Sequence, residues 1–168
     1  MAAQKHPGGT PATTVLSRLG VEFAVHEFTH APGDRHYGLV AAEALGIDGA
    51  RVFKTLLAKV DGSPASGVAV AIVPVSGQLS LKELAQSMGA KRAEMCDPVV
   101  AERLTGYVVG GISPFGQKKR LPTAIDESCR LHETIFVSGG KRGLEIEIVP
   151  DDLIAVLDAV VARIAVAR

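Results

Sequence analysis

VFKTLLAKVDGSPASGVAVAIVPV, residues 52–75, is the stretch that decides the fold of this chain. Residues 52–60 are rich in β-branched, aliphatic and aromatic side chains, and the Asp-Gly pair that follows is typical of a turn. Residues 68–75 then form a second apolar run. Two such runs on either side of a turn predict a pair of neighbouring strands. The second run is apolar at nearly every position, which favours a strand buried on both faces.

Short helices and further strands are expected on both sides of this hairpin. Capping residues and terminal glycines, such as Thr10-Pro11 with Gly20, predict helices at residues 10–20, 39–46, 80–88 and 97–104. Apolar residues at helical spacing predict a last helix at residues 151–165. Strands are expected at residues 21–25, 91–95, 107–109, 123–125, 134–137 and 144–149. This mixture of hairpins and helices predicts one α/β domain with a mixed, strongly curved sheet.

Composition narrows the function classes. The chain has 168 residues, enough for one domain with its own core. Lys+Arg and Asp+Glu are each 18, so the net charge is zero, which argues against binding to nucleic acid through bulk charge but allows a local basic patch. Cys96 and Cys129 form no C-x-x-C pair, which suits a reducing compartment, and both are interpreted as structural. Residues 1–14 lack a signal-peptide core, so we expect a cytoplasmic protein without membrane association.

HEFTH, residues 26–30, matches the H-E-x-x-H pattern of zinc metalloproteases. That pattern binds zinc only on a helix, where both histidines lie on one face. Here Val21, Phe23 and Val25 alternate before the motif as in a strand. In a strand the two histidines would lie roughly 13 Å apart, too far for one metal ion. We therefore interpret HEFTH as the end of a strand running into a loop, and expect no metal.

Lys54 is an unusual residue in the first strand of the hairpin. At strand spacing it shares a face with Val52, Leu56 and Ala58, so its ammonium group lies in an otherwise apolar row. A buried ammonium must reach water, find a partner or serve a ligand. An edge-strand lysine that blocks aggregation is the structural alternative, and spacing alone does not separate the two.

Two glycine-rich loops, GGISPFGQKKR at residues 110–120 and SGGKRG at residues 138–143, combine glycine pairs with clustered cations. Glycine pairs allow the backbone to approach a ligand closely, and neighbouring cations offer contacts to phosphate. Each loop alone could equally be a solvated turn. Together they favour RNA or a phosphorylated ligand.

Three segments carry a resemblance to a known family: FKTLL at residues 53–57, TGYVVGGISPFGQKKR at residues 105–120 and VSGGKRG at residues 137–143. In this order and spacing they resemble the YbaK/EbsC family of bacterial Cys-tRNA(Pro) deacylases, over nearly the whole chain. The resemblance implies a barrel-like mixed sheet with surrounding helices, so that residues 10–168 form one editing domain after a flexible arm at residues 1–9. It also implies hydrolysis of mischarged Cys-tRNA(Pro), and of Cys-tRNA(Cys) as a further candidate substrate.

The resemblance also implies a set of site residues. Lys54 is the expected catalytic residue, and no cofactor is expected. The expected substrate contacts are Phe28, Tyr37, Thr55, Gly110, Gly111, Ser138, Gly139, Gly140 and Glu145. The cations expected to bind tRNA are Lys118, Lys119, Arg120, Lys141 and Arg142. The implied mechanism uses the substrate's own thiol as the nucleophile, with the protein supplying position and electrostatic stabilisation.

Two positions depart from the family pattern. Phe28 stands where a tyrosine is usual, and Glu145 stands where an aspartate is usual. Both changes bear on which aminoacyl group is preferred. A deacylase for another small aminoacyl group such as alanine, and a tRNA- or synthetase-binding module without turnover, are the alternative functions. Aminoacyl-tRNA is the expected partner, with prolyl-tRNA synthetase as a transient one.

Overall fold

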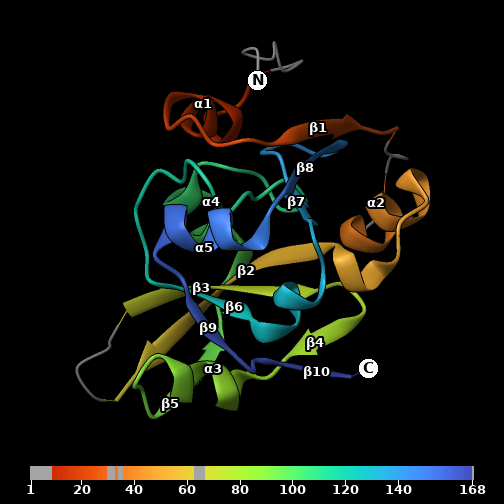
Figure 1. The fold of residues 1–168 in the computed structure, drawn as a ribbon. Helices are drawn as coiled ribbons and strands as arrows, with labels where there is room; N and C mark the ends of the chain where they lie inside the picture. Colours follow the sequence, from red (N-terminus) through yellow and green to blue (C-terminus); the bar gives the residue numbers. More distant parts are fainter. Residues whose placement is uncertain (1–8, 30–32, 34–35, 63–66, 168) are drawn as a thin grey trace.

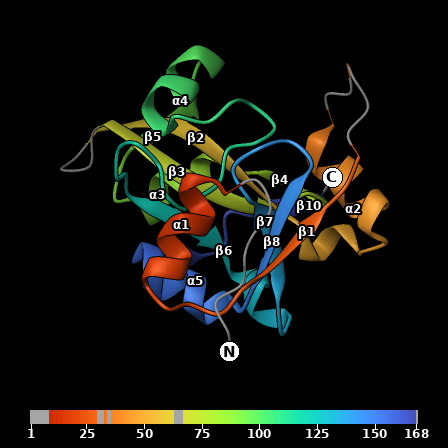
Figure 2. The ribbon, with the colours of Figure 1, turned by 90° about the horizontal axis from the view of Figure 1, so that it is seen from above.

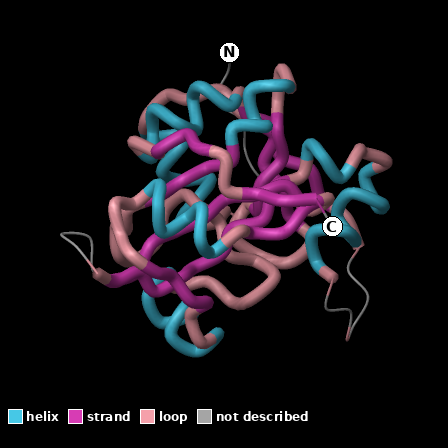
Figure 3. Tube along the Cα trace, turned by 90° about the horizontal axis from the view of Figure 1, so that it is seen from below, coloured by secondary structure: helices cyan, strands magenta, loops and turns pink. Residues whose placement is uncertain are grey.

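The computed structural model describes residues 9–29, 33, 36–62 and 67–167, and its strands lie in the middle of the molecule with helices around them (Figure 3). The α-helices are α1 (Pro11–Arg18), α2 (Tyr37–Leu45), α3 (Leu81–Ser87), α4 (Pro98–Thr105) and α5 (Pro150–Leu157). Two short 3-10 helices are η1 (Gly49–Arg51) and η2 (Glu127–Leu131). The strands are β1 (Ala24–Glu27), β2 (Phe53–Asp61), β3 (Gly67–Pro74), β4 (Gly77–Leu79), β5 (Arg92–Met95), β6 (Thr123–Asp126), β7 (Ile135–Ser138), β8 (Leu144–Ile148), β9 (Val160–Ala162) and β10 (Ala165–Ala167).

The predicted hairpin forms the centre of the largest sheet. β2 and β3 pair antiparallel, with Lys54 opposite Val73 and Leu57 opposite Val70. This sheet has the order β5-β2-β3-β6-β9, and β6 joins both β3 and β9 in parallel. A second sheet has the order β1-β8-β7, and β10 pairs with β4. Mixed sheets in one α/β domain confirm the predicted fold class, although in the described part of the chain the sheets do not close into a barrel.

The main hydrophobic core lies between the two larger sheets. Leu57 of β2 and Ile72 of β3 face Val137 of β7 and Ile146 of β8 there, with Leu16 of α1 packed against the same cluster. Figure 1 shows α1 and β1 at one end of the molecule and the β2–β3 hairpin nearer its middle. Seen from above, β1 runs alongside β8, its antiparallel partner (Figure 2).

The opposite face of the hairpin packs on a smaller core. Ala58 of β2 with Ala71 and Val73 of β3 contact Leu84 of α3 and Ile164 near the C-terminal end. β3 therefore has apolar neighbours on both faces, as its continuous apolar run predicted.

The capping residues in the sequence predicted correctly where α1, α3 and α4 begin. The Thr10 side chain accepts the amide of Thr13 in a reciprocal capping box at α1, and Ser80 accepts the amide of Glu83 at α3. The Asp97 side chain accepts the Val99 amide at the start of α4. These bonds satisfy amides that the first turn of a helix leaves without partners, so they fix where each helix begins.

The predicted last helix at residues 151–165 is wrong beyond Leu157. Asp158 adopts a left-handed conformation with φ 50° and ends α5, after which β9 pairs with β6 and β10 pairs with β4. The buried Asp126 side chain accepts the amides of Ile164 and Ala165, at 2.9 and 2.8 Å. Because of these tertiary hydrogen bonds, the segment forms strands although its apolar residues have helical spacing. The β-branched pair Val160-Val161 is also well suited to a strand.

The predicted strand at residues 107–109 is also wrong, because side chains hold this segment as a loop. The Val109 amide donates to Glu102 Oε2 at 2.8 Å, and the Tyr107 hydroxyl donates to the Phe115 carbonyl at 2.7 Å. β4 was not predicted, since three residues give too short a pattern. The arm predicted at residues 1–9 falls outside the described residues except for Gly9, and it stays a prediction.

Among the described residues, no helix has the length and apolar character needed to cross a membrane.

Candidate functional site

A cavity of about 350 Å³ lies beside β2, between the two larger sheets and α2. This volume falls in the range of pockets that hold small ligands. Of the residues predicted for the site, those that line the cavity are Phe28, Tyr37, Lys54, Thr55, Gly110, Ser138 and Glu145. They come from α2, β2, β7, β8, the residue that follows β1 and the loop after α4, so the fold brings together segments far apart in the sequence.

The cavity lies where one edge of β2 has no neighbouring strand in the described part of the chain. β5 pairs with β2 only from Ala58 to Asp61. At the other end, the only isolated bridge to β7 among the described residues joins Phe136 to Val52, the residue just before β2. The edge of β2 between these two points faces the cavity. An unpaired strand edge offers amide donors and carbonyl acceptors to whatever binds beside it.

Thr55 presents its backbone to this open edge. The Val75 amide donates to the Val52 carbonyl from the β3 side, and the Cys96 amide donates to the Leu57 carbonyl from the opposite side. Backbone groups alternate between the two sides along a strand, so even-numbered residues of β2 face β3 and odd-numbered residues face away. The N–H and C=O of Thr55 therefore point toward the cavity edge.

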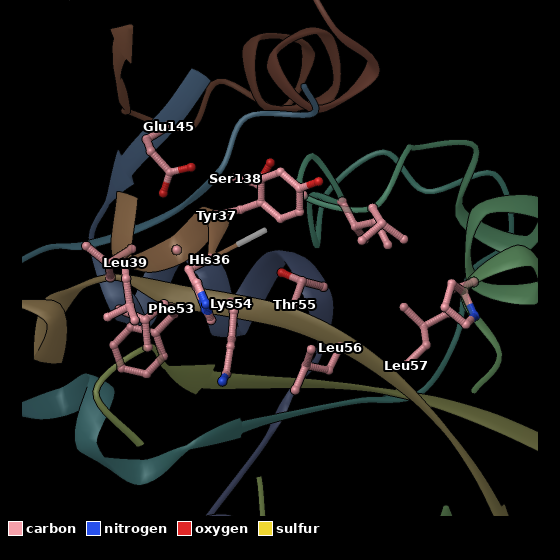
Figure 4. Close-up of a pocket in the computed structure, with 18 of the residues that line it drawn as sticks. His36, Tyr37, Leu39, Phe53, Lys54, Thr55, Leu56, Leu57, Ser138 and Glu145 are labelled. Carbon is pink, nitrogen blue, oxygen red and sulfur yellow. The ribbon is translucent and has the colours of Figure 1, made fainter. Parts of the chain in front are cut away.

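Lys54 and Thr55 lie on opposite faces of β2, because successive side chains in a strand alternate. Figure 4 draws Thr55 on the same side of β2 as Tyr37, Ser138 and Glu145, with the Lys54 side chain on the other side. The cavity contacts both faces, so it wraps around the open edge of the strand. The site is thus divided into a Thr55 side and a Lys54 side.

The hydroxyl group of Thr55 is buried without a hydrogen bond. The residue is 9% exposed, and Thr55 Oγ1 has no partner among the described residues. Leaving a buried hydroxyl unsatisfied is unfavourable by about 1–3 kcal/mol. A ligand that hydrogen-bonds to Thr55 Oγ1 would recover part of this free energy.

Glu145 contributes a buried carboxyl group on the same side as Thr55. Its residue is 8% exposed, and it stands directly opposite Ser138 of β7 and His26 of β1 in the sheet. Burial raises the pKa of the Glu145 carboxyl to about 8, since desolvation disfavours the charged form. At neutral pH this group is mainly a neutral acid, which can both donate and accept a hydrogen bond.

Glycines let three segments meet closely at the cavity wall. A Cβ atom on Gly110, whose φ is +88°, would lie 2.7 Å from the ring of Tyr37. A Cβ atom on Gly111 would lie 2.8 Å from the Cα atom of Lys141, so the two glycine-rich loops touch backbone to backbone. The glycine backbone was predicted to approach a ligand closely. At Gly111 the close contact is instead with the backbone of Lys141 in the other glycine-rich loop.

We expect Gly111→Ala to lower the free energy of unfolding by about 1–3 kcal/mol, because the added methyl group meets backbone atoms that cannot rotate away. Gly9→Ala is the matched control, since a Cβ atom there meets nothing within 4 Å, and its effect should stay within about 0.5 kcal/mol. Urea unfolding of both variants measures the difference. Equal stabilities would show that the contact between the two loops is not tight.

The other predicted residues lie outside the cavity wall. Gly139 packs against Leu144, and Gly140 packs against Tyr107 and Thr10. Both glycines therefore support the loop behind Ser138.

The predicted cations occupy two separate regions. Lys118 and Lys119 are exposed and donate their amides to Thr105 and Leu104, near the end of α4. Arg120 lines a second cavity of about 340 Å³, between α3 and the end of α5. Lys141 and Arg142 are exposed in the β7–β8 loop, and the Arg142 guanidinium lies 4.8 Å from the centre of the Tyr37 ring. Only the second group lies beside Tyr37.

HEFTH is not a helix where the structure describes it. His26 and Glu27 belong to β1, Phe28 lines the cavity, and His30 lies outside the described residues. His26 Nε2 lies 2.9 Å from Glu147 Oε1, on the neighbouring strand β8. The strand interpretation of this segment is confirmed at residues 24–27.

Sequence reasoning missed Cys96, His36 and Met95, which also line the cavity. Cys96 lies outside the glycine-rich loops, so its sequence position predicts only a structural role. Desolvation by burial raises the pKa of Cys96 and raises that of the fully buried Cys129 to about 11. Both thiols are therefore protonated at neutral pH, which makes them weak nucleophiles.

Residues 39–156 match the family of the aminoacyl-tRNA editing domain. The chain is 36% identical over 164 residues to a protein of Enterococcus faecalis named as a Cys-tRNA(Pro)/Cys-tRNA(Cys) deacylase, EbsC, across 98% of both chains. It is 31% identical over 127 residues to the Multifunctional Ser/Thr-tRNA deacylase ProXp-y of Escherichia coli K12, across 74% of each.

A solved structure described as a trans-editing enzyme for prolyl tRNA synthetase has a TM-score of 0.76. The match covers 98% of this chain and 100% of that one, and at 23% identity it shows a common fold. The resemblance found in the sequence is thereby confirmed: the chain belongs to the aminoacyl-tRNA editing domain family.

Proposed function

We propose that this protein removes cysteine from mischarged Cys-tRNA(Pro), with Cys-tRNA(Cys) as a further substrate. The observation that carries the proposal is the buried hydroxyl of Thr55, which has no partner among the described residues and lines a cavity that also contacts Lys54. A polar group in this state needs a polar ligand. The 36% identity to a protein named as a deacylase of these two substrates supports the choice of aminoacyl group.

The divided cavity suits an aminoacyl ester at the end of a tRNA. In the proposed complex the cysteinyl group lies on the side of Thr55, Ser138 and Glu145, where the Thr55 and Glu145 side chains are buried. The terminal nucleotide passes around the open edge of β2 toward Lys54, whose ammonium group neutralises phosphate or ribose oxygen. Phe28 and Tyr37 enclose the aminoacyl group with aromatic surface. The longer side chain of Glu145 narrows this space relative to the aspartate usual in the family.

The proposed reaction needs no nucleophile from the protein. The cysteine thiol loses its proton and its sulfur attacks the ester carbonyl carbon, forming a strained cyclic thioester. The bond between that carbon and the ribose oxygen breaks, and the ribose oxygen takes up a proton. Water then opens the cyclic thioester and yields free cysteine. The Thr55 amide at the open edge is suited to stabilise the carbonyl oxygen, and Lys54 the departing ribose oxygen.

The exposed cations are proposed as contacts for the tRNA backbone. Lys118 and Lys119 offer positive charge near the end of α4, Arg120 offers it beside the second cavity, and Lys141 offers it in the β7–β8 loop. Each phosphate contact would make binding weaker as salt concentration rises. We place the activity in the cytoplasm, with transient contact to prolyl-tRNA synthetase, which a pull-down of the synthetase with this protein tests.

Cys-tRNA(Pro) should be deacylated at least about tenfold faster than Ser-tRNA(Pro), because a thiol is far more acidic and nucleophilic than an alcohol. Single-turnover rates with both substrates measure this ratio. Cys96→Ala and Cys129→Ala should stay within a few-fold of the parent. A large loss in Cys96→Ala, with the fold retained, would place the nucleophile on the protein. Equal rates on the two substrates would point to an activated water instead.

Deacylation of other small aminoacyl groups is a second candidate function. The cavity of about 350 Å³ exceeds the volume of a cysteine side chain, and one relative is named as a Ser/Thr-tRNA deacylase. A panel of Cys-, Ala-, Ser-, Thr- and Pro-charged tRNA separates the candidates. Absence of turnover on all five would leave a binding module as the function.

A further inference from the structure

The side chain of Arg142 joins three separate walls of the cavity. It starts from the β7–β8 loop, and its Nε donates to the carbonyl of Val109 at 2.9 Å. Its guanidinium carbon lies 4.8 Å from the centre of the Tyr37 ring, at the start of α2. Both contacts engage the planar guanidinium group, which can stack on a ring and donate in its own plane at the same time.

Both residues that Arg142 contacts belong to the cavity wall. Tyr37 and Val109 line the cavity, whereas Arg142 itself does not. The Val109 amide also donates to Glu102 Oε2 of α4 at 2.8 Å, so this peptide segment is held from two sides. The Tyr37 ring packs so closely on Gly110 that a Cβ atom there would lie 2.7 Å from it. Arg142 and Gly110 thus both contact the Tyr37 ring, and Arg142 ties that ring to the segment that contains Val109 and Gly110.

We infer that Arg142 is a positioning residue, which holds Tyr37 against Gly110 and so fixes the wall around the aminoacyl group. This inference rests on the proposed function for its effect on catalysis. It differs from the expectation that Arg142 binds a tRNA phosphate, because Nε of Arg142 already donates to Val109 and the guanidinium already contacts the Tyr37 ring. Lys141, its exposed neighbour, remains the cation of this loop that is suited to phosphate.

The variant Arg142→Lys distinguishes an effect of the positive charge from an effect of the planar guanidinium group. Lysine keeps the positive charge but has no planar group that stacks and donates together. If Arg142 positions Tyr37, both Arg142→Lys and Arg142→Gln should lower the single-turnover rate at saturating substrate by about tenfold. Tyr37→Leu should lower the rate by a similar factor. The double variant Arg142→Gln/Tyr37→Leu should lower the rate by about tenfold in total, and not by about a hundredfold, because each single change already removes the same contact.

A phosphate contact predicts the opposite pattern. Arg142→Lys would then behave like the parent, Arg142→Gln would lower the slope of log affinity against log salt by about one, and its effect would add to that of Tyr37→Leu. Lys59→Gln, a change at an exposed lysine of β2 outside the cavity, is the control and should change neither the salt dependence nor the rate at saturation. Arg142→Lys at the parental rate, with additive double-variant effects, overturns the inference.

Tyrosine fluorescence tests the contact without any assay of activity. The chain has no tryptophan and two tyrosines, so Tyr107→Phe leaves Tyr37 as the only strongly fluorescent side chain. In that background, Arg142→Gln and Arg142→Lys should increase quenching of Tyr37 by acrylamide, while Lys141→Gln should not. Should Tyr107→Phe fail to fold, hydrogen exchange at the start of α2 replaces this readout, and protection there should fall in both Arg142 variants. Unchanged quenching or exchange contradicts the inference, whereas a parent protein without deacylation contradicts the proposed function alone.

Discussion

Replacing Lys54 by alanine is expected to lower the rate of Cys-tRNA(Pro) deacylation by about 100-fold or more, with the fold retained. Lys54 lines the cavity from the face of β2 opposite Thr55, in a row that also holds Val52 and Leu56. Its ammonium group is the charge that the proposed mechanism places near the departing ribose oxygen. Loss of such a preorganised charge raises the barrier without changing the core, because the residue is only half-buried.

Lys59 provides a matched control for this variant, since it is an exposed lysine of the same strand outside the cavity. Lys59→Ala should keep the parental rate within a few-fold. Lys54→Arg keeps the charge with a bulkier, planar group, so we expect partial activity. Circular dichroism and urea unfolding establish that each variant is folded. Near-parental turnover by Lys54→Ala would remove Lys54 from the mechanism.

The stability of the protein is expected to fall as pH rises from about 4.5 to about 8, because of Glu145. Burial raises the pKa of this carboxyl from 4.5 to about 8 in the folded state. Between these values the folded protein keeps a proton that the unfolded chain has lost, so the unfolded state binds fewer protons and the free energy of unfolding decreases with pH. Below this window both states are protonated, and above it the full loss, on the order of a few kcal/mol, is present.

Glu145→Gln should remove this slope, since an amide does not titrate. Urea unfolding at pH 5 and pH 9 should therefore show a smaller loss of stability in the variant than in the parent. Glu94→Gln, a change at an exposed carboxyl of β5, should leave the parental difference unchanged. A parental difference retained in Glu145→Gln would mean that the carboxyl is already ionised at neutral pH in the folded protein.

Much of the fold could be predicted from interactions between residues that are close in the sequence. The hairpin of β2 and β3 follows from two apolar runs around a turn, and Ser80 and Asp97 mark helix starts through side-chain bonds to amides only two or three residues away. Such interactions need no knowledge of the tertiary structure. They therefore appear in the sequence as spacing and residue type.

Long-range contacts decided the elements that were predicted wrongly. Residues 158–165 carry helical spacing, but Asp126, far earlier in the sequence, accepts the amides of Ile164 and Ala165 and holds this segment out of the helix. The site shows the same limit. Cys96 reaches the cavity through pairing next to Leu57, and Arg142 contacts Tyr37 across 105 positions, so neither placement leaves a local pattern.

The register of the central hairpin sets the chemistry of the site as well as its packing. Lys54 and Thr55 are adjacent and so lie on opposite faces of β2, and the pairing of Lys54 with Val73 decides which face each of them takes. A slip of β2 by one residue would exchange the two faces, bringing the ammonium group to the main core and the hydroxyl to the other side. That register would be unstable, because burying a charged ammonium group in the main core costs far more free energy than burying a hydroxyl group. Lys54, which the proposed function assigns to the substrate, thus also disfavours the misaligned register of the hairpin during folding.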